Sequence, residues 1–84
     1  MNGILLTSKS MTYAQQMKKA LERNGFFAEI VRPDTELTRG SCAYAVNISQ
    51  KFLPEVLDVL RLNKLLPVRA ILIEGKRKYR ELKI

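Results

Sequence analysis

The sequence is poor in the residues on which most enzyme active sites depend. Among its 84 residues there is no histidine and only one cysteine. The lack of imidazole excludes histidine general bases, Cys–His and Ser–His nucleophile pairs and the commonest metal ligand. A lone cysteine gives neither an intramolecular disulfide nor, without histidine, a zinc site within one chain. Because there is also no glycine-rich phosphate loop, we expect a non-enzymatic carrier or binding protein without cofactor or metal.

Long hydrophobic runs are missing as well. No apolar run approaches the ~18 residues that are needed to span a bilayer. The first residues, 1–6, lack the basic start, longer apolar stretch and cleavage site of a signal peptide. We therefore expect a cytoplasmic protein with no membrane partner. With 46% apolar residues, the chain has material for one hydrophobic core, and we expect a single α/β domain at residues 3–75.

The charge of the chain is +7 and is unevenly placed. Residues 76–83 hold five bases and one acid, more than half of the excess. Such a segment could attract nucleic acid or an acidic protein face. Short charged chain ends are more often solvated and frayed, so we interpret residues 76–84 as a basic C-terminal tail.

Hydrophobic periodicity predicts four strands and two helices. Ser10 is suited to the N-cap of the first helix, and Gly25 is suited to end it. Strands are predicted at residues 3–7, 26–31, 43–48 and 68–73, and helices at 11–24 and 52–64. The order β-α-β-β-α-β predicts the α+β arrangement called ferredoxin-like. In that arrangement two helices cover one face of a four-stranded antiparallel sheet.

Such a sheet leaves one face without helices. If the strand rows that contain Ala28 and Ala70 face the helices, the rows that contain Phe27 and Ile71 form an uncovered apolar patch. Exposed patches of that kind usually mark an interface. We therefore predict a homodimer in which the open sheet faces pack together.

Cys42 is the one candidate nucleophile. A thiol reacts as its thiolate, and because the pKa of a free cysteine is ~8.5, a reactive cysteine needs a stabilising environment. Arg39 could supply a nearby positive charge, while Gly40 and Ser41 could let backbone N–H groups point at the sulfur. No neighbouring base is available, so the activation would be electrostatic.

A structural role for Cys42 competes with this interpretation. In a strand it shares the phase of Tyr44, Val46 and Ile48, which are candidate core residues. Unpaired cysteine is among the most buried residue types. Cys42 would then be the first core residue of its strand.

The sequence around Cys42 also resembles that of a known group of proteins. Pro33 starts a loop that reaches Ser41-Cys42-Ala43, and a strand of small and apolar residues follows. With the opening strand at residues 4–8 and the helix after it, the chain resembles the selenium/sulfur carrier protein-like family of small bacterial single-cysteine domains. The resemblance covers about residues 3–73, and Ala43 stands where that family usually has glycine. It implies that Cys42 accepts sulfur or selenium as a persulfide or perselenide from a donor protein and passes it to an acceptor protein.

Two further classes of function stay open. An RNA-recognition module of the same topology stacks bases on aromatic residues of its central strands. Here the first strand has no aromatic residue and the third offers only Tyr44, so the basic charge alone supports nucleic-acid binding. The other alternative is a dimeric assembly subunit in which the cysteine is structural.

Overall fold

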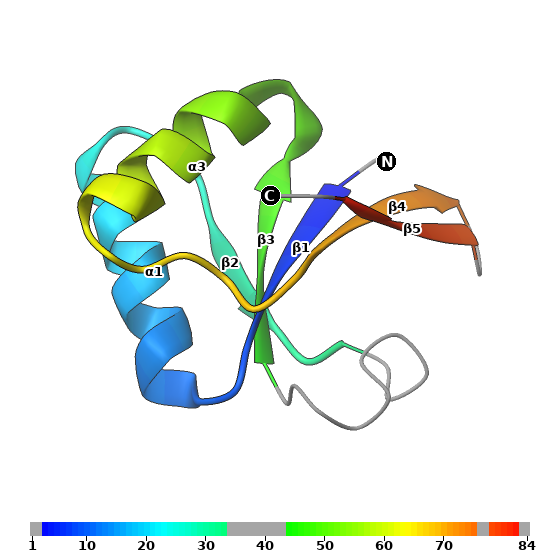
Figure 1. Cartoon of the computed structure of the whole chain (residues 1–84), viewed down its shortest axis with the longest axis horizontal. Coiled ribbons are helices and arrows are strands. Elements are labelled where there is room, and N and C mark those ends of the chain that lie inside the picture. Colours follow the sequence, from blue (N-terminus) through cyan, green and yellow to red (C-terminus); the bar gives the residue numbers. More distant parts are fainter. Residues whose placement is uncertain (1–2, 34–43, 76–77, 83–84) are drawn as a thin grey trace.

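The protein is an α+β domain with two α-helices and a five-stranded antiparallel sheet (Figure 1). The computed structural model describes residues 3–33, 44–75 and 78–82. Its elements are β1 (Gly3–Ser8), α1 (Met11–Arg23), β2 (Glu29–Val31), β3 (Tyr44–Ser49), the 3₁₀ turn η1 (Gln50–Phe52), α3 (Leu53–Leu62), β4 (Ala70–Gly75) and β5 (Lys78–Leu82). The sheet order is β2-β3-β1-β4-β5, and every neighbouring pair is antiparallel.

The strand count corrects the sequence-based prediction of four strands. Residues 78–82, which we interpreted as part of a basic tail, form β5 and pair along β4. Two ion pairs and one apolar contact explain why this charged segment joins the sheet. Arg80 forms an ion pair of 3.0 Å with Glu74 of β4, Glu81 forms an ion pair with Arg69, and Leu82 packs against the main core. Because two charges are compensated and one apolar side chain is partly buried, the segment gains more by pairing than its composition suggests.

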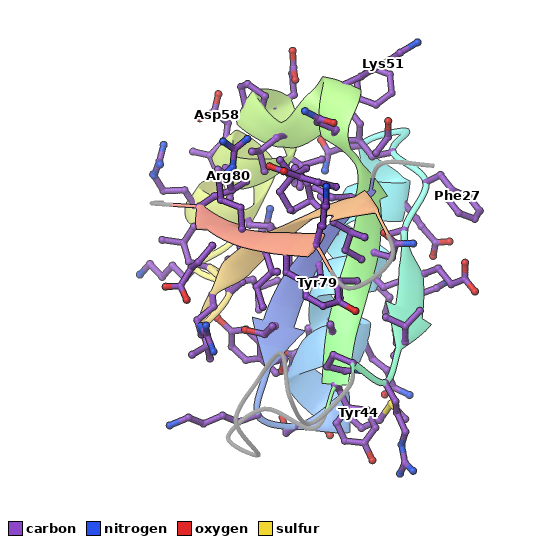
Figure 2. The ribbon with its side chains drawn as sticks, turned by 90° about the vertical axis from the view of Figure 1, so that its right-hand side faces the viewer. Phe27, Tyr44, Lys51, Asp58, Tyr79 and Arg80 are labelled. Atoms are coloured by element: carbon purple, nitrogen blue, oxygen red, sulfur yellow. The ribbon has the colours of Figure 1, made fainter. Side chains whose placement is uncertain are left out.

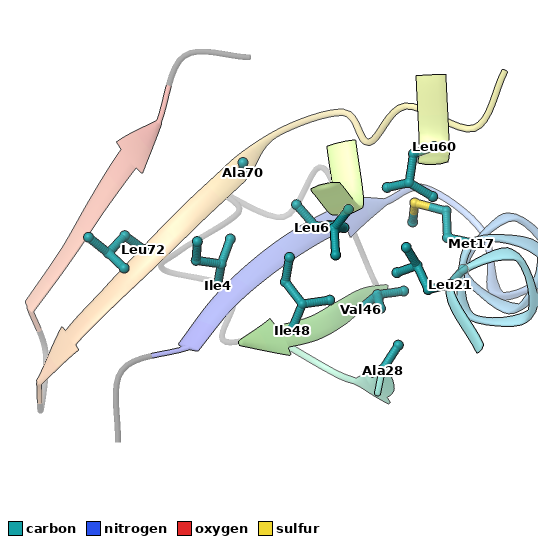
Figure 3. Packing of buried hydrophobic residues seen from close by; sticks show 12 residues of the cluster. Ile4, Leu6, Met17, Leu21, Ala28, Val46, Ile48, Leu60, Ala70 and Leu72 are labelled. Carbon is teal, nitrogen blue, oxygen red and sulfur yellow. The ribbon is translucent and has the colours of Figure 1, made fainter. Parts of the chain in front are cut away.

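Both helices cover the same face of the sheet, as predicted. The main core lies between them and the alternate residues of β1, β3 and β4 (Figure 3). Met17 and Leu21 of α1 and Val56 and Leu60 of α3 are buried against it. The sheet contributes Ile4, Leu6, Val46, Ile48, Ala70 and Leu72.

The end of α1 explains why β2 is shorter than predicted. Gly25 has φ +83°, and its N–H donates to the carbonyl of Glu22. The next N–H, that of Phe26, donates to the carbonyl of Leu21 at 2.9 Å, which completes a Schellman motif. The ring of Phe26 then lies 5.7 Å from that of Phe52. Phe26 therefore belongs to the helix end rather than to the predicted strand at residues 26–31.

The other boundaries differ from the predictions by a few residues. Helix α1 begins at the predicted residue, with the Ser10 hydroxyl accepting the N–H of Tyr13 at 3.1 Å. Pro54 lies in the first turn of α3, where its missing N–H costs nothing. Strand β4 begins two residues later than predicted because the ladder with β1 is irregular at Thr7. The Arg69 N–H donates to the Thr7 hydroxyl, and the Thr7 carbonyl accepts the N–H of Val68 instead.

The face without helices carries a second, smaller apolar cluster. Leu5, Ala45 and Ile71 are buried there, with Val31 and Ile73 partly buried beside them. The row of Ala70 faces the helices as expected, but the uncovered patch that we predicted is smaller than expected. Ile71 is only 2% exposed, whereas Phe27 is 80% exposed.

We predict that two leucines of α3 differ sharply in their contribution to stability. Leu60 is fully buried and Leu62 is 84% exposed, although they lie two residues apart. Leu60→Ala leaves a cavity in the main core and should lower the free energy of unfolding by about 3 kcal/mol. The matched control, Leu62→Ala, should change it by less than about 0.5 kcal/mol. Urea unfolding of the two variants measures both effects, and equal losses would contradict the described packing.

Candidate functional site

The residues predicted for the site lie outside the described part of the chain. Cys42, Arg39, Gly40 and Ser41 all fall within residues 34–43, which we call the Cys42 segment. The structure describes both flanks of this segment. These flanks, Arg32–Pro33 and Tyr44, show where the segment leaves the sheet and where it returns.

Both flanks lie at the same end of the sheet. Strands β2 and β3 are antiparallel neighbours, and Val31 pairs with Ala45. Beyond that pair, the Nη2 of Arg32 donates to the hydroxyl of Tyr44 at 3.4 Å. The guanidinium carbon of Arg32 also lies 5.5 Å from the centroid of the Tyr44 ring, within the range of a cation–π contact. Figure 2 shows Tyr44 at the opposite end of the molecule from Lys51.

Arg32 brings a permanent positive charge to this end of the sheet. The hydrogen bond to Tyr44 raises the pKa of Arg32 above its ordinary value, with a further electrostatic contribution from the same residue. Because the guanidinium is protonated at any physiological pH, the charge does not titrate. From the sequence we expected the nearby charge to come from Arg39 and not from Arg32, because a cross-strand register cannot be derived from the sequence.

The end of β1 completes this part of the molecule. Ser8 pairs with Tyr44 across the β1–β3 ladder. Its buried hydroxyl donates to the carbonyl of Ser10 at 2.9 Å and accepts the Ser10 N–H at 3.3 Å. These bonds fix the turn that leads from β1 into α1. The start of α1 therefore lies beside the strand that follows the Cys42 segment.

Buried hydrogen bonds tie the same end of β1 to the chain before β4. The buried hydroxyl of Thr7 accepts the N–H of Arg69 at 2.9 Å and donates to the carbonyl of the same residue at 3.2 Å. The Thr7 N–H donates to that carbonyl as well, and the Thr7 carbonyl accepts the N–H of Val68. Thr7 thus holds the segment before β4 against the central strand.

Two cavities lie along the connector that joins α3 to β4. The first, of about 320 Å³, lies between the start of α1 and the connector, and its lining is Lys9, Ser10, Tyr13, Leu66, Pro67 and Val68. The Tyr13 hydroxyl donates to the Leu66 carbonyl at 2.7 Å and holds the connector against α1. The second, of about 310 Å³, is lined by Gln16, Lys19, Ala20, Arg23, Asn63 and Leu65.

A third cavity of about 300 Å³ lies at the opposite end of the sheet. It is lined by Gly3, Phe27, Glu29, Asn47, Ile48, Ser49 and Ile73. The Oδ1 of Asn47 is buried here and has no hydrogen-bond partner in the described part of the chain. A Cβ on Gly3 would stand 2.6 Å from that oxygen, so the missing side chain of Gly3 makes room for the amide.

On the open sheet face, the two central strands β1 and β3 carry no aromatic residue at the places where an RNA-recognition module has its stacking residues. The central positions of this face are Leu5 on β1 and Ala45 and Asn47 on β3. None of them is aromatic, although RNA-recognition modules stack bases on aromatic side chains of the central strands. Tyr44, the one aromatic residue that we considered for this role, belongs to the other strand phase and packs against the main core.

Residues 3–33, 44–75 and 78–82 contain neither a metal-binding cluster nor a membrane-crossing helix. Within these residues no group of three or more His, Cys, Asp or Glu side chains is placed to hold a metal ion. No helix among them is long and apolar enough to cross a bilayer.

The chain matches no family model. Comparisons with curated proteins and with solved structures give no significant match either.

We predict that the Thr7 hydroxyl contributes measurably to stability. Thr7→Val keeps the shape of the side chain but removes the side-chain acceptor of the partly buried Arg69 N–H, which should cost about 1–2 kcal/mol of unfolding free energy. Thr7→Ser keeps the hydroxyl and is the matched control, with a smaller loss. The comparison is made by thermal and urea unfolding, and a valine variant as stable as the parent would show that the hydroxyl is dispensable.

Proposed function

We propose that the chain is a non-enzymatic sulfur or selenium carrier, which holds a persulfide or perselenide on Cys42 and passes it to a partner protein. The observation that carries the proposal is the contact between Arg32 and Tyr44, which flank the Cys42 segment on its two sides. Because these flanks meet, we expect the segment to start and finish at one end of the sheet. A carrier needs its sulfur at such an end, where two partners can reach it in turn.

The transfer requires no change in overall oxidation state. The Cys42 thiolate attacks the outer sulfur of a donor persulfide, the sulfur–sulfur bond of the donor breaks, and the donor leaves as a thiolate. Cys42 then carries the outer sulfur as its own persulfide, and attack by an acceptor thiolate repeats the exchange. The same scheme applies when the outer atom is selenium.

Positive charge supports this chemistry. A nearby cation stabilises a thiolate relative to its thiol and stabilises the terminal anion of a persulfide. Arg32 is a described cation at this end of the sheet, and Arg39 lies within the Cys42 segment. In this proposal the two arginines share the role that we first expected of Arg39.

A ferredoxin-like fold is part of the same proposal. The element order β1-α1-β2-β3-α3-β4 and the sheet order β2-β3-β1-β4 are those of a split βαβ arrangement. Strand β5 would be an addition at the β4 edge. The main core between one sheet face and both helices supports this assignment.

The second candidate function is self-association through the open sheet face, with a smaller contact surface than we expected from the sequence. Phe27 projects from the edge of the sheet beside β2 and is exposed (Figure 2). It lines the third cavity together with Ile73. A homodimer would therefore centre on Phe27 and Ile73, because Leu5 and Ile71 are already buried within one chain.

We predict that incubation with a sulfane-sulfur donor adds the mass of one sulfur atom to the protein. Cys42→Ser should abolish this addition and leave the thermal midpoint nearly unchanged, because the lone cysteine is the acceptor. Intact-mass spectrometry before and after reduction measures the addition. If Cys42 resists alkylation until the protein is unfolded, the carrier proposal fails and a structural cysteine is the better interpretation.

The arginines give a second prediction. Removing a positive charge near the thiol favours its protonated form, so Arg32→Gln and Arg39→Gln should each slow alkylation of Cys42 near neutral pH, by about threefold. Lys51→Gln removes the same charge at the far end of the molecule and should leave the rate unchanged. The measurement is the rate of iodoacetamide labelling across a pH series. Equal slowing by all three substitutions would indicate a general charge effect and no local one.

A further inference from the structure

A surface along the connector between α3 and β4 combines exposed aliphatic side chains with positive charge. We call it the connector groove, and it consists of connector residues 63–68 with Lys9, Tyr13, Lys19 and Arg23 from α1 and its start. The first two cavities lie next to each other along it, since Leu66 lines one and Leu65 the other. In Figure 1 the connector runs from the end of α3 across to β4.

Exposed apolar side chains lie within this groove. Leu66, which is 41% exposed, and Val68, which is 48% exposed, both line its first cavity. Leu62, which is 84% exposed, directly precedes the connector at the end of α3. Single exposed apolar residues need no explanation, but a cluster of them marks an interaction surface.

The charges at the groove are all positive. Lys9, Lys19 and Arg23 line its cavities, and no acidic residue does. None of the three has an ion-pair partner among the described residues, whereas the nearby Glu22 is paired with Lys18 at 2.9 Å. Lys19 and Arg23 are four residues apart on one helix face, where like charges weaken a helix. An acidic ligand would remove this repulsion.

Lys64, another cation of the groove, has an unusual backbone conformation. Helix α3 ends in the same motif as α1, with the Leu65 N–H donating to the Leu60 carbonyl at 2.8 Å. In α1 the left-handed position of this motif is occupied by Gly25, but in α3 it is occupied by Lys64, with φ 57°. A side chain in this conformation is strained, and such strain is found at functional sites more often than elsewhere. The position therefore carries a cation at a place where glycine would be more stable.

We propose that the connector groove binds an acidic segment of a partner protein that also carries apolar side chains. Positive charge alone would fit nucleic acid, but single strands bind to exposed aromatic platforms. The exposed large apolar residues that line the groove are Leu66 and Val68, and the hydroxyl of Tyr13 is already bonded to the Leu66 carbonyl. Aliphatic side chains with surrounding cations complement an acidic, apolar peptide.

The groove begins close to the end of the sheet that holds the flanks of the Cys42 segment. Lys9 follows Ser8, which pairs with Tyr44. A partner in the groove would thus lie beside that end, although the inference does not depend on the chemistry of Cys42.

The test is a selection of peptides from a random library on the wild-type chain. Enriched peptides should contain both carboxylates and apolar residues, and one of them is then synthesised for titration. The double variant Lys19→Glu/Arg23→Glu should weaken its binding by at least about tenfold, and so should Leu66→Ser/Val68→Ser. Amide chemical shifts on binding should change along the connector and α1. The charge-matched control Lys51→Glu/Lys78→Glu should bind as the wild type does.

The Lys64→Gly variant distinguishes a loss of peptide binding from a loss of folding stability. Glycine relieves the left-handed strain, so this variant should have a higher thermal midpoint and yet bind the peptide severalfold more weakly. Cys42→Ser should bind normally, which makes the outcome independent of sulfur transfer. The proposal would be overturned if no peptide were enriched, or if the enriched peptides lacked carboxylates. It would also be overturned if the Lys19→Glu/Arg23→Glu variant bound the peptide as tightly as the wild type. Displacement of the peptide by a random single-stranded oligonucleotide that binds more tightly would overturn it in favour of nucleic acid.

Discussion

The structure depends on the burial of β1 on both of its faces. Ile4 and Leu6 point into the main core beneath the helices, while Leu5 is buried in the smaller cluster on the opposite face. A strand with both faces apolar must lie inside a sheet, and β1 pairs with β3 on one side and β4 on the other. The last two residues of β1, Thr7 and Ser8, are polar and buried, and both are hydrogen-bonded. The central strand thereby fixes the start of α1 and the approach to β4.

Both helices end in the same way, but with different consequences for the surface. Gly25 turns the chain after α1 without strain, and the following Phe26 packs against Phe52. After α3 the corresponding turn is made at Lys64, and the chain then runs back over α1 to β4. The second turn leaves aliphatic residues and cations exposed on one continuous segment. The same backbone motif thus completes the core in one place and builds the proposed docking surface in the other.

The two proposed functions of the molecule meet at one end of the sheet. The antiparallel pairing of β2 and β3 brings Arg32 and Tyr44 together, and the β1–β3 ladder places Ser8 beside Tyr44. In these proposals, the positive charge of Arg32 that would stabilise a thiolate and the connector groove that would bind a partner protein are close in space. A carrier requires this combination, because its sulfur must be held between transfers and a partner must be bound while the transfer occurs.

Local sequence patterns were enough to predict the two helices and the antiparallel α+β class, whereas the rows of Ala28 and Ala70 were placed toward the helices only as a condition. Periodicity is a local property, so Met17, Leu21, Val56 and Leu60 were identifiable as core residues from their spacing. The fifth strand, the Arg32–Tyr44 contact and the connector groove were decided only by the tertiary structure. Each of them joins residues that are distant in the sequence, or depends on a partner that compensates a charge. A count of lysines and arginines at residues 76–83 does not reveal that Arg80 forms an ion pair with Glu74 of β4 or that Leu82 packs against the core. The roles of Arg39, Gly40, Ser41 and Cys42 remain predictions from the sequence, because the charge and accessibility of a thiol depend on residues that folding brings near to it.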